Sequence, residues 1–221
     1  MRTVRQPRAV ETREKILGEA ARLFALKGYH DTKLEEVLKA AQVTTGAFFH
    51  HFSSKEDLGF AVIDRHMEKR RQRLEQIEKR LPPPDEDDPL QPVFRRLDAI
   101  QEMIRHREQR KGGCVIGNLS TTLSDTHDAF RQRLARCFDE MEQEFRPHLD
   151  AAAARQKPKP KRGAAASVDA AALARYIVAI VEGSIMLTRT HHDRHMMARH
   201  FDYLKEHLKQ ALRVPGPSAR A

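Results

Sequence analysis

The sequence predicts an all-α protein of about nine helices: a three-helix N-terminal head, a connecting helix and a larger helical body. Apolar residues recur every three or four positions along most of the 221-residue chain, which is the period of an amphipathic helix. Alternating apolar and polar runs, typical of strands, are nearly absent. Hydroxyl, acidic, glycine and proline residues stand where these helices would begin and end.

The first predicted helix begins at Thr12 as N-cap and ends at Gly28. Its apolar face consists of Ile16, Ala20, Leu23 and Phe24. The second begins around Thr32, whose spacing to Glu35 is that of a capping box, and ends near Gln42. Its inward residues are Leu34, Val37, Leu38 and Ala41.

A third helix is predicted from Thr44 through Phe49, and a fourth from Ser54 to about Arg80. The first module therefore covers residues 1–55, with two short helices joined by a tight turn at about 33–52. A connecting helix then covers residues 56–80.

Residues 81–92, LPPPDEDDPLQP, cannot stay helical and are expected to form a loop between modules. A second domain is expected at 93–213. Its helices are predicted at about 93–106, at 114–123, from a cap at Ser124 or Asp125 to about 145, from 169 onward and at 195–213. The basic low-complexity segment 151–167 is expected to be a mobile loop, and residues 214–221 a disordered tail.

The charge balance favours a polyanionic partner. Lys and Arg number 40 against 31 Asp and Glu, and the sequence pI is about 9.8. No apolar run is expected to span a membrane, and the N-terminus lacks the apolar region of a secretory signal. Two cysteines are too few for a disulfide framework, so a cytoplasmic protein with reduced thiols is expected. No cofactor is expected.

Two short helices joined by a tight turn and braced by a longer one form a helix-turn-helix. The second of the pair opens the stretch TTGAFFHHFSSK, where Thr44 caps a helix tip of small residues, Thr45, Gly46 and Ala47. Such a tip can enter a DNA major groove. Phe48 and Phe52 are four residues apart and are expected to point back to the helices behind, and Lys55 is within reach of a phosphate.

The sequence supports other functions less well. Adjacent His50 and His51 point about 100° apart on a helix and do not chelate a metal together. A helical enzyme is not supported, because no phosphate loop, nucleophile elbow or HExxH motif occurs. A nucleic-acid-packaging protein stays as the alternative, and it would coat any DNA sequence equally.

Residues 12–55, from TREKILGEAARLFALKGYHDTKLEEVL to AAQVTTGAFFHHFSSKEDL, resemble the N-terminal domain of the TetR family of bacterial transcriptional repressors. The resemblance implies a homodimer that places one head in each of two successive major grooves of a palindromic operator, until an effector releases it. It places Thr45, Gly46 and Ala47 on base edges. It places Phe49 and His51 on the DNA backbone, Lys55 on a phosphate and Lys33 at the head of the second helix.

Two positions depart from the family pattern. Phe49 stands where the family usually has a tyrosine whose hydroxyl binds phosphate, so that contact is not expected here. Gln42 stands where the family usually has a glycine, and positive φ there predicts local strain.

The segments at 112–134 and 182–193 resemble the family subgroup that responds to electrophiles such as N-ethylmaleimide or acrylate-like compounds. Cys114 stands at the sensor position of that subgroup, at a predicted helix start behind Arg110 and Lys111, where a thiolate is favoured. The alternatives are a buried Cys114 and a non-covalent small-molecule effector. Cys137 is expected in the core, and a Cys114–Cys137 disulfide stays open.

Two further sets of residues complete the expectations, and no metal site is among them. An effector pocket is predicted from Leu97, Ile100, Met103, Ile104, Leu119, Leu123, Phe138 and Met141. In this family the last two helices form a four-helix bundle with their twofold mates. The expected interface residues are Ile177, Ile180, Ser184, Leu187, Phe201, Leu204 and Leu208. His191 and His195 have the spacing of a metal pair, but a helix break at Asp193 is expected to separate them.

Overall fold

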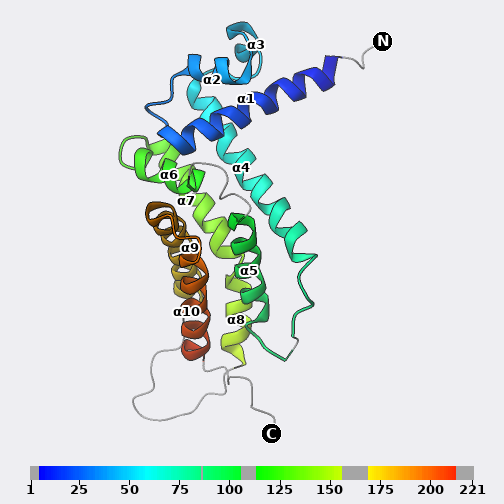
Figure 1. Ribbon diagram of the computed structural model, residues 1–221, viewed down its shortest axis with the longest axis vertical. Helices are drawn as coiled ribbons and strands as arrows, with labels where there is room; N and C mark the ends of the chain where they lie inside the picture. Colours follow the sequence, from blue (N-terminus) through cyan, green and yellow to red (C-terminus); the bar gives the residue numbers. More distant parts are fainter. Residues whose placement is uncertain (1–4, 86, 106–112, 156–168, 213–221) are drawn as a thin grey trace. The chain divides into compact units, whose positions relative to one another are not determined.

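The computed structural model describes residues 5–85, 87–105, 113–155 and 169–212, and these residues confirm the all-α fold (Figure 1). They contain ten helices and no strand. The helices are α1 Arg5–Lys27, α2 Leu34–Ala41, α3 Thr45–Phe49, α4 Lys55–Glu78, α5 Gln91–Arg105, α6 Val115–Leu123, α7 Asp128–Gln143, α8 Arg146–Ala154, α9 Ala170–His191 and α10 Met196–Ala211. The predicted tail at 214–221, residues 156–167 of the predicted loop, and Arg110 and Lys111 lie outside the described residues.

Two helix boundaries correct the expectations. The first helix begins at Arg5, so Thr12 lies inside it and is not its N-cap. Pro7 does not prevent this, because proline is tolerated in the first turn of a helix. The seventh helix begins at Asp128 rather than at Ser124 or Asp125, after a turn in which the His127 amide donates to the Leu123 carbonyl at 2.9 Å.

The helix α8 was not predicted. The residues at 151–154 are helical, although they were expected to open a mobile loop. Pro147 stands in the first turn of α8, Leu149 and Ala152 are buried, and alanine has the strongest intrinsic helix propensity. Low complexity was therefore a poor guide where the repeated residue is alanine.

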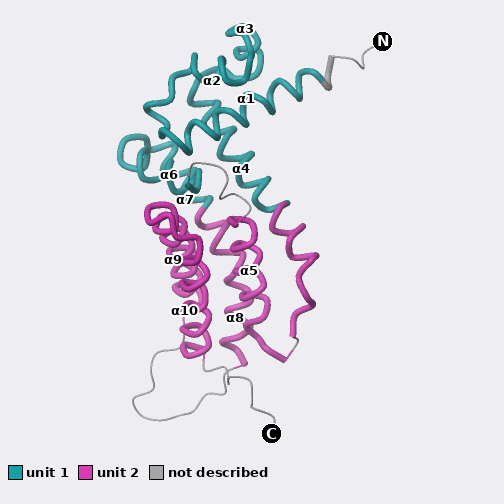
Figure 2. Tube along the Cα trace, viewed as in Figure 1, with its two compact units in different colours: residues 1–72, 110–137 teal, residues 73–109, 138–221 magenta. Residues whose placement is uncertain are grey.

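The chain divides into two compact units that do not follow the predicted domains (Figure 2). The first unit contains residues 1–72 and 110–137, and the second contains 73–109 and 138–221. The boundaries fall inside α4 and α7, not in the predicted loop at 81–92. The head therefore shares one compact unit with α6 and the first half of α7.

An aromatic cluster explains why α7 belongs to the first unit. The ring of Phe130 stacks on Phe60 with centroids 4.4 Å apart and lies 5.1 Å from the ring of Tyr29. A Cβ on Gly59 would come within 2.6 Å of Phe130 Cζ, so only glycine lets this ring approach the backbone of α4. The Phe130 side chain is fully buried as a result.

The second unit packs α5, α8, α9 and α10 around a core that includes Ile100, Leu149, Ile177 and Phe201. The Lys205 ammonium donates to Asp98 at 2.5 Å and ties α10 to α5. Charged residues interrupt every apolar run of spanning length in α9, but by length and mean composition alone this helix could cross a membrane. Its contacts with α8 and α10 give these apolar residues a role inside the unit.

Candidate nucleic-acid interface

The turn after α1 sets the position of the two short helices. Gly28 adopts φ 85°, a left-handed conformation that favours glycine, and its amide donates to the Phe24 carbonyl at 3.0 Å. The Thr32 hydroxyl is buried and donates to the Gly28 carbonyl at 2.7 Å. Thr32 therefore closes this turn and does not cap α2, contrary to the sequence prediction.

The N-cap of α2 is Lys33, one residue later than predicted. Its backbone amide donates to the Glu36 carboxylate at 3.2 Å, and that carboxylate also pairs with Lys27 at 2.6 Å. Both bonds hold the pKa of Glu36 below its ordinary value, with the Lys27 bond the larger cause. The Glu36 carboxylate, in an ion pair with Lys27, thus stabilises the start of α2, and the Lys33 residue is exposed.

Gln42 confirms the predicted left-handed turn. It adopts φ 55° and ψ 46°, and the following Val43 amide donates to the Leu38 carbonyl at 3.0 Å. A non-glycine residue pays a steric cost in this region. The turn from α2 to α3 is therefore made with local strain, as expected.

The tip of α3 is exposed and capped as the sequence predicts. The Thr44 hydroxyl accepts a bond from the Ala47 amide at 3.2 Å, and Thr44, Thr45 and Gly46 all face solvent. A Cβ built on Gly46 meets nothing within 4 Å. The fold therefore gives no internal reason for glycine at this helical position, where it costs about 1 kcal/mol relative to alanine.

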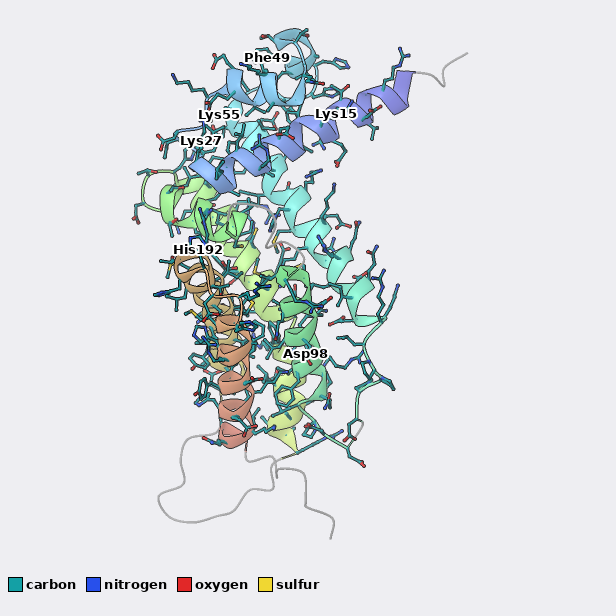
Figure 3. The ribbon with its side chains drawn as sticks, viewed as in Figure 1. Lys15, Lys27, Phe49, Lys55, Asp98 and His192 are labelled. Carbon is teal, nitrogen blue, oxygen red and sulfur yellow. The ribbon has the colours of Figure 1, made fainter. Side chains whose placement is uncertain are left out.

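The phenylalanines behind the tip divide into two kinds. Phe48 and Phe52 are buried, with ring centroids 5.5 Å apart, as predicted. Phe49 is 55% exposed and meets Phe48 edge-on. Figure 3 shows Phe49 on α3, at the outer end of the head. The exposed ring of Phe49 thus lacks the hydroxyl donor of the tyrosine that the family resemblance implies at this position.

Lys55 has a partner within the head that the sequence did not indicate. Its ammonium donates to the Tyr29 backbone carbonyl at 2.7 Å and lies 4.4 Å from the centroid of the Tyr29 ring. Burial lowers the pKa of Lys55, and the charge of Asp31 opposes this effect. Burial and the charge of Glu56 raise the pKa of Tyr29 to about 12. An ammonium carries three donors, so the bond to the Tyr29 carbonyl does not prevent a second bond to a phosphate. The phosphate contact of Lys55 stays a prediction.

The surroundings of His51 favour the neutral form of its side chain. Burial, followed by the charges of His50 and Arg13, lowers its pKa below the ordinary value of histidine. The Arg13 guanidinium lies 5.2 Å from the centroid of the Phe52 ring, beside the end of α3. The lowered pKa favours the neutral imidazole, and a contact of His51 with the DNA backbone stays a prediction.

The candidate sensor and core cysteines take different positions. Cys114 is the partly exposed N-cap of α6, and Cys137 is fully buried in α7. No disulfide joins them. Arg133 donates to the Cys137 sulfur at 3.4 Å and to Asp64 at 2.6 Å, so the buried thiol has a polar partner that the sequence did not suggest.

The predicted pocket residues fall in both compact units. In the second unit Leu97, Ile100, Met103 and Met141 are buried, and Ile104 and Phe138 are partly buried. The other two predicted pocket residues, Leu119 and Leu123, are buried in the first unit. A shared pocket thus stays a prediction.

Most of the predicted interface residues are covered by the chain itself. Burial within the described residues accounts for Ile177, Ser184, Phe201, Leu204 and Leu208. The Ser184 hydroxyl lies 3.0 Å from His200 Nδ1, also within this chain. Of the predicted set, Ile180 and Leu187 reach the surface of this chain, and the dimer interface stays a prediction.

The histidine-rich turn between α9 and α10 breaks where predicted. The Asp193 carboxylate accepts the His195 amide at 2.9 Å and the Arg199 guanidinium at 2.5 Å. His192 ends α9 in the left-handed region with φ 52°. In the part of the chain that the structure describes, no group of His, Cys, Asp and Glu is arranged to hold a metal ion.

Two family models match this chain. Residues 16–62 match the model described as bacterial regulatory proteins, tetR family. Residues 93–204 match the model of the tetracyclin repressor-like C-terminal domain.

Several named proteins are similar in sequence. An uncharacterized HTH-type transcriptional regulator of Lactococcus lactis is 29% identical over 88% of this chain and 91% of its own length. The transcriptional regulator AcuR of Cereibacter sphaeroides is 34% identical, over 49% of this chain and 47% of its own length. The repressor NemR of Escherichia coli is 39% identical, over 30% of this chain and 34% of its own length.

Solved structures agree with the fold. A TetR transcriptional regulator from Chloroflexus aurantiacus aligns with a TM-score of 0.76 and 28% identity, over 92% of this chain and 97% of that one. Reduced E. coli NemR aligns with a TM-score of 0.66 over 88% of this chain and 96% of that one, and at 20% identity it supports the fold alone.

Replacing Gly46 with alanine is expected to have opposite effects on stability and on DNA binding. The free protein should gain about 0.5–1 kcal/mol in free energy of unfolding, because the new methyl meets no atom and favours the helix. Affinity for DNA should fall by about tenfold or more, because the backbone of the tip can no longer approach the bases.

Chemical denaturation measures the stability, and fluorescence anisotropy with an operator duplex identified by footprinting measures the DNA affinity. The matched control is Gly18→Ala in α1, where the added Cβ has an ordinary contact of 3.7 Å with Arg65. It should share the stability gain and leave DNA affinity unchanged. Unchanged DNA affinity in Gly46→Ala would show that the tip does not enter the groove.

Proposed function

The chain belongs to the TetR family of bacterial transcriptional regulators, and we propose that it represses transcription by binding a palindromic operator as a homodimer. The observation that carries this proposal is the exposed, capped tip of α3, with a glycine that the fold itself does not need. Two such tips related by twofold symmetry read two major grooves about one helical turn apart.

The alternative is a packaging protein that binds DNA of any sequence. The excess of 40 basic over 31 acidic residues serves both functions, because phosphate attraction is independent of sequence. A fixed helix tip with Thr45 and Gly46 exposed favours the operator instead, because packaging requires no small-residue surface matched to a groove.

Footprinting on DNA around the protein's own gene tests the operator directly. We expect one protected palindrome whose half-sites are centred about ten base pairs, or a small multiple of that, apart. Its affinity should exceed that of a scrambled duplex by about 10³-fold or more at the same salt concentration. Uniform protection of all sequences would support the packaging function.

A particular face of α9, extended by α10, is proposed to form the dimer. Residues Tyr176, Ile180, Gly183 and Leu187 share one side of α9, and Tyr203 on α10 is 77% exposed. A Cβ on Gly183 meets nothing within 4 Å, so this chain alone does not require glycine there. Close approach of a second α9 supplies the reason.

Replacing Gly183 with leucine should therefore weaken the dimer without unfolding the subunit. Added volume at a closely packed helix crossing costs about 1–3 kcal/mol, which corresponds to roughly a 5- to 150-fold weaker dimer. Sedimentation velocity over a concentration series measures this, with exposed Ala135→Leu on α7 as the matched control. A dimer of unchanged strength would place the interface elsewhere.

The proposed effector is an electrophile that reacts with Cys114, as the resemblance to the electrophile-responsive subgroup implies. Cys114 is partly exposed at the N-terminus of α6, where unpaired amides and the helix dipole favour the thiolate. With N-ethylmaleimide the thiolate sulfur forms a bond to one alkene carbon, the π bond of the alkene breaks, and its electron pair takes a proton from water at the neighbouring carbon, which leaves hydroxide. A non-covalent ligand held among the predicted pocket residues is the second candidate.

N-Ethylmaleimide distinguishes the two candidates. Wild-type protein should lose operator affinity after treatment, while Cys114→Ser, which keeps the size of the side chain but not the thiolate, should retain it. Cys137→Ala is the control, because a fully buried thiol should not contribute to the response. Operator release from treated Cys114→Ser at the wild-type level would end the thiol proposal and leave the non-covalent one.

A further inference from the structure

We propose that Asn118 is the positioning residue through which α6 controls the DNA-binding head. The proposal rests on the proposed function above and assigns the step between the sensor segment and the α2–α3 pair. Asn118 lies on α6, and its amide nitrogen donates to the Ala25 backbone carbonyl at 2.8 Å, across 93 positions of sequence.

The accepting carbonyl lies at a sensitive point of the head. Ala25 is buried in the last turn of α1, just before the left-handed turn at Gly28. The end of a helix leaves carbonyls without partners inside the helix, so the amide of Asn118 satisfies a group that α1 cannot. A Cβ built on Gly28 would lie 3.9 Å from the Thr122 methyl, so α6 also contacts the turn itself.

That turn sets where the reading helices lie. Thr32 is fully buried and donates to the Gly28 carbonyl at 2.7 Å, two residues before α2 begins at Leu34. Contacts also join α1 directly to α2 and to α3. A displacement of the end of α1 is therefore passed to the helices that carry Thr45 and Gly46.

The other end of the connection is the candidate sensor. The Asn118 backbone amide donates to the Cys114 carbonyl at 2.9 Å, in the first turn of α6. Cys114 is the N-cap that directly precedes the first turn of α6, and Asn118 lies one turn further along the chain. A maleimide adduct on Cys114 thus adds bulk one turn away from the Asn118 side chain.

The start of α7 prevents the whole segment from moving as one piece. The ring of Phe130 is enclosed by Gly59, Phe60 and Tyr29 of the same compact unit. The C-terminal end of the segment is therefore held against α4 and the turn after α1. A shift at the first turn of α6 must either move the end of α1 or break the bond from Asn118.

The test uses the full-length dimer, the operator found by footprinting and N-ethylmaleimide as the probe. Asn118→Ala should bind the operator about tenfold more weakly before treatment, from the loss of one partly buried hydrogen bond in each head. Treatment should weaken this variant by less than about twofold, because the bond that transmits the change is already absent. Unmodified Asn118→Ala should thus resemble treated wild type.

Two further variants make the result specific. Asn118→Asp keeps the shape of the side chain but, when ionised, has no donor for the Ala25 carbonyl. It should therefore show the same weaker binding and small response as Asn118→Ala, and it serves as the test if the alanine variant does not fold. Thr121→Ala is the matched control, because the exposed Thr121 hydroxyl bonds within α6, to the Asn118 carbonyl at 3.0 Å. It should keep both the wild-type affinity and the wild-type response. Thermal melts establish that each protein is folded.

The outcomes separate this inference from the function beneath it. Folded Asn118 variants with wild-type affinity, or with the full wild-type response to N-ethylmaleimide, overturn the role of Asn118. A wild-type protein that binds the operator but ignores the reagent contradicts the Cys114 sensor, and with it the proposed route. A wild-type protein without operator preference contradicts the repressor function itself.

Discussion

The burial of Phe48 and Phe52 behind α3 is the packing on which the head depends. A helix of five residues does not persist by itself in water, because nucleation of so short a helix is unfavourable. Both rings are buried, while the Thr44 hydroxyl caps the tip and Gln42 accepts a strained turn. Apolar burial on one side therefore stabilises an exposed, polar tip on the other, and that tip is what a DNA groove can contact.

The compact unit that contains the head also includes elements from much later in the chain. Asn118 closes the end of α1, and Phe130 fills a space that exists because Gly59 has no side chain. Lys55 and Tyr29 tie the start of α4 to the turn after α1. A regulator needs a rigid reading surface that can still be influenced from elsewhere, and the proposed route through Asn118 uses the packing that the head shares with residues 113–137.

Electrostatics in the head favour contact with DNA without fixing its sequence. Glu14 and Glu36 pair with nearby cations, whereas Lys33 and Arg13 face solvent. Burial, followed by the charges of His50 and Arg13, lowers the pKa of His51 and so favours its neutral form. Because phosphate attraction carries no sequence information, we propose that sequence preference comes from the shape and hydrogen bonds of the α3 tip.

Local sequence determined the helical class, the cap at Thr44, the exposed tip, the inward Phe48 and Phe52, and the left-handed Gln42, because each depends on residues within one or two turns. Periodicity identifies an apolar face but does not show which neighbour covers it. The stripe with Phe201, Leu204 and Leu208 fits a partner subunit equally well, and only the tertiary structure showed that the chain covers it itself. The Tyr29 partner of Lys55 and the bond from Asn118 to Ala25 join residues 26 and 93 positions apart. Such contacts leave no trace in spacing, because chain folding rather than local propensity brings their atoms together.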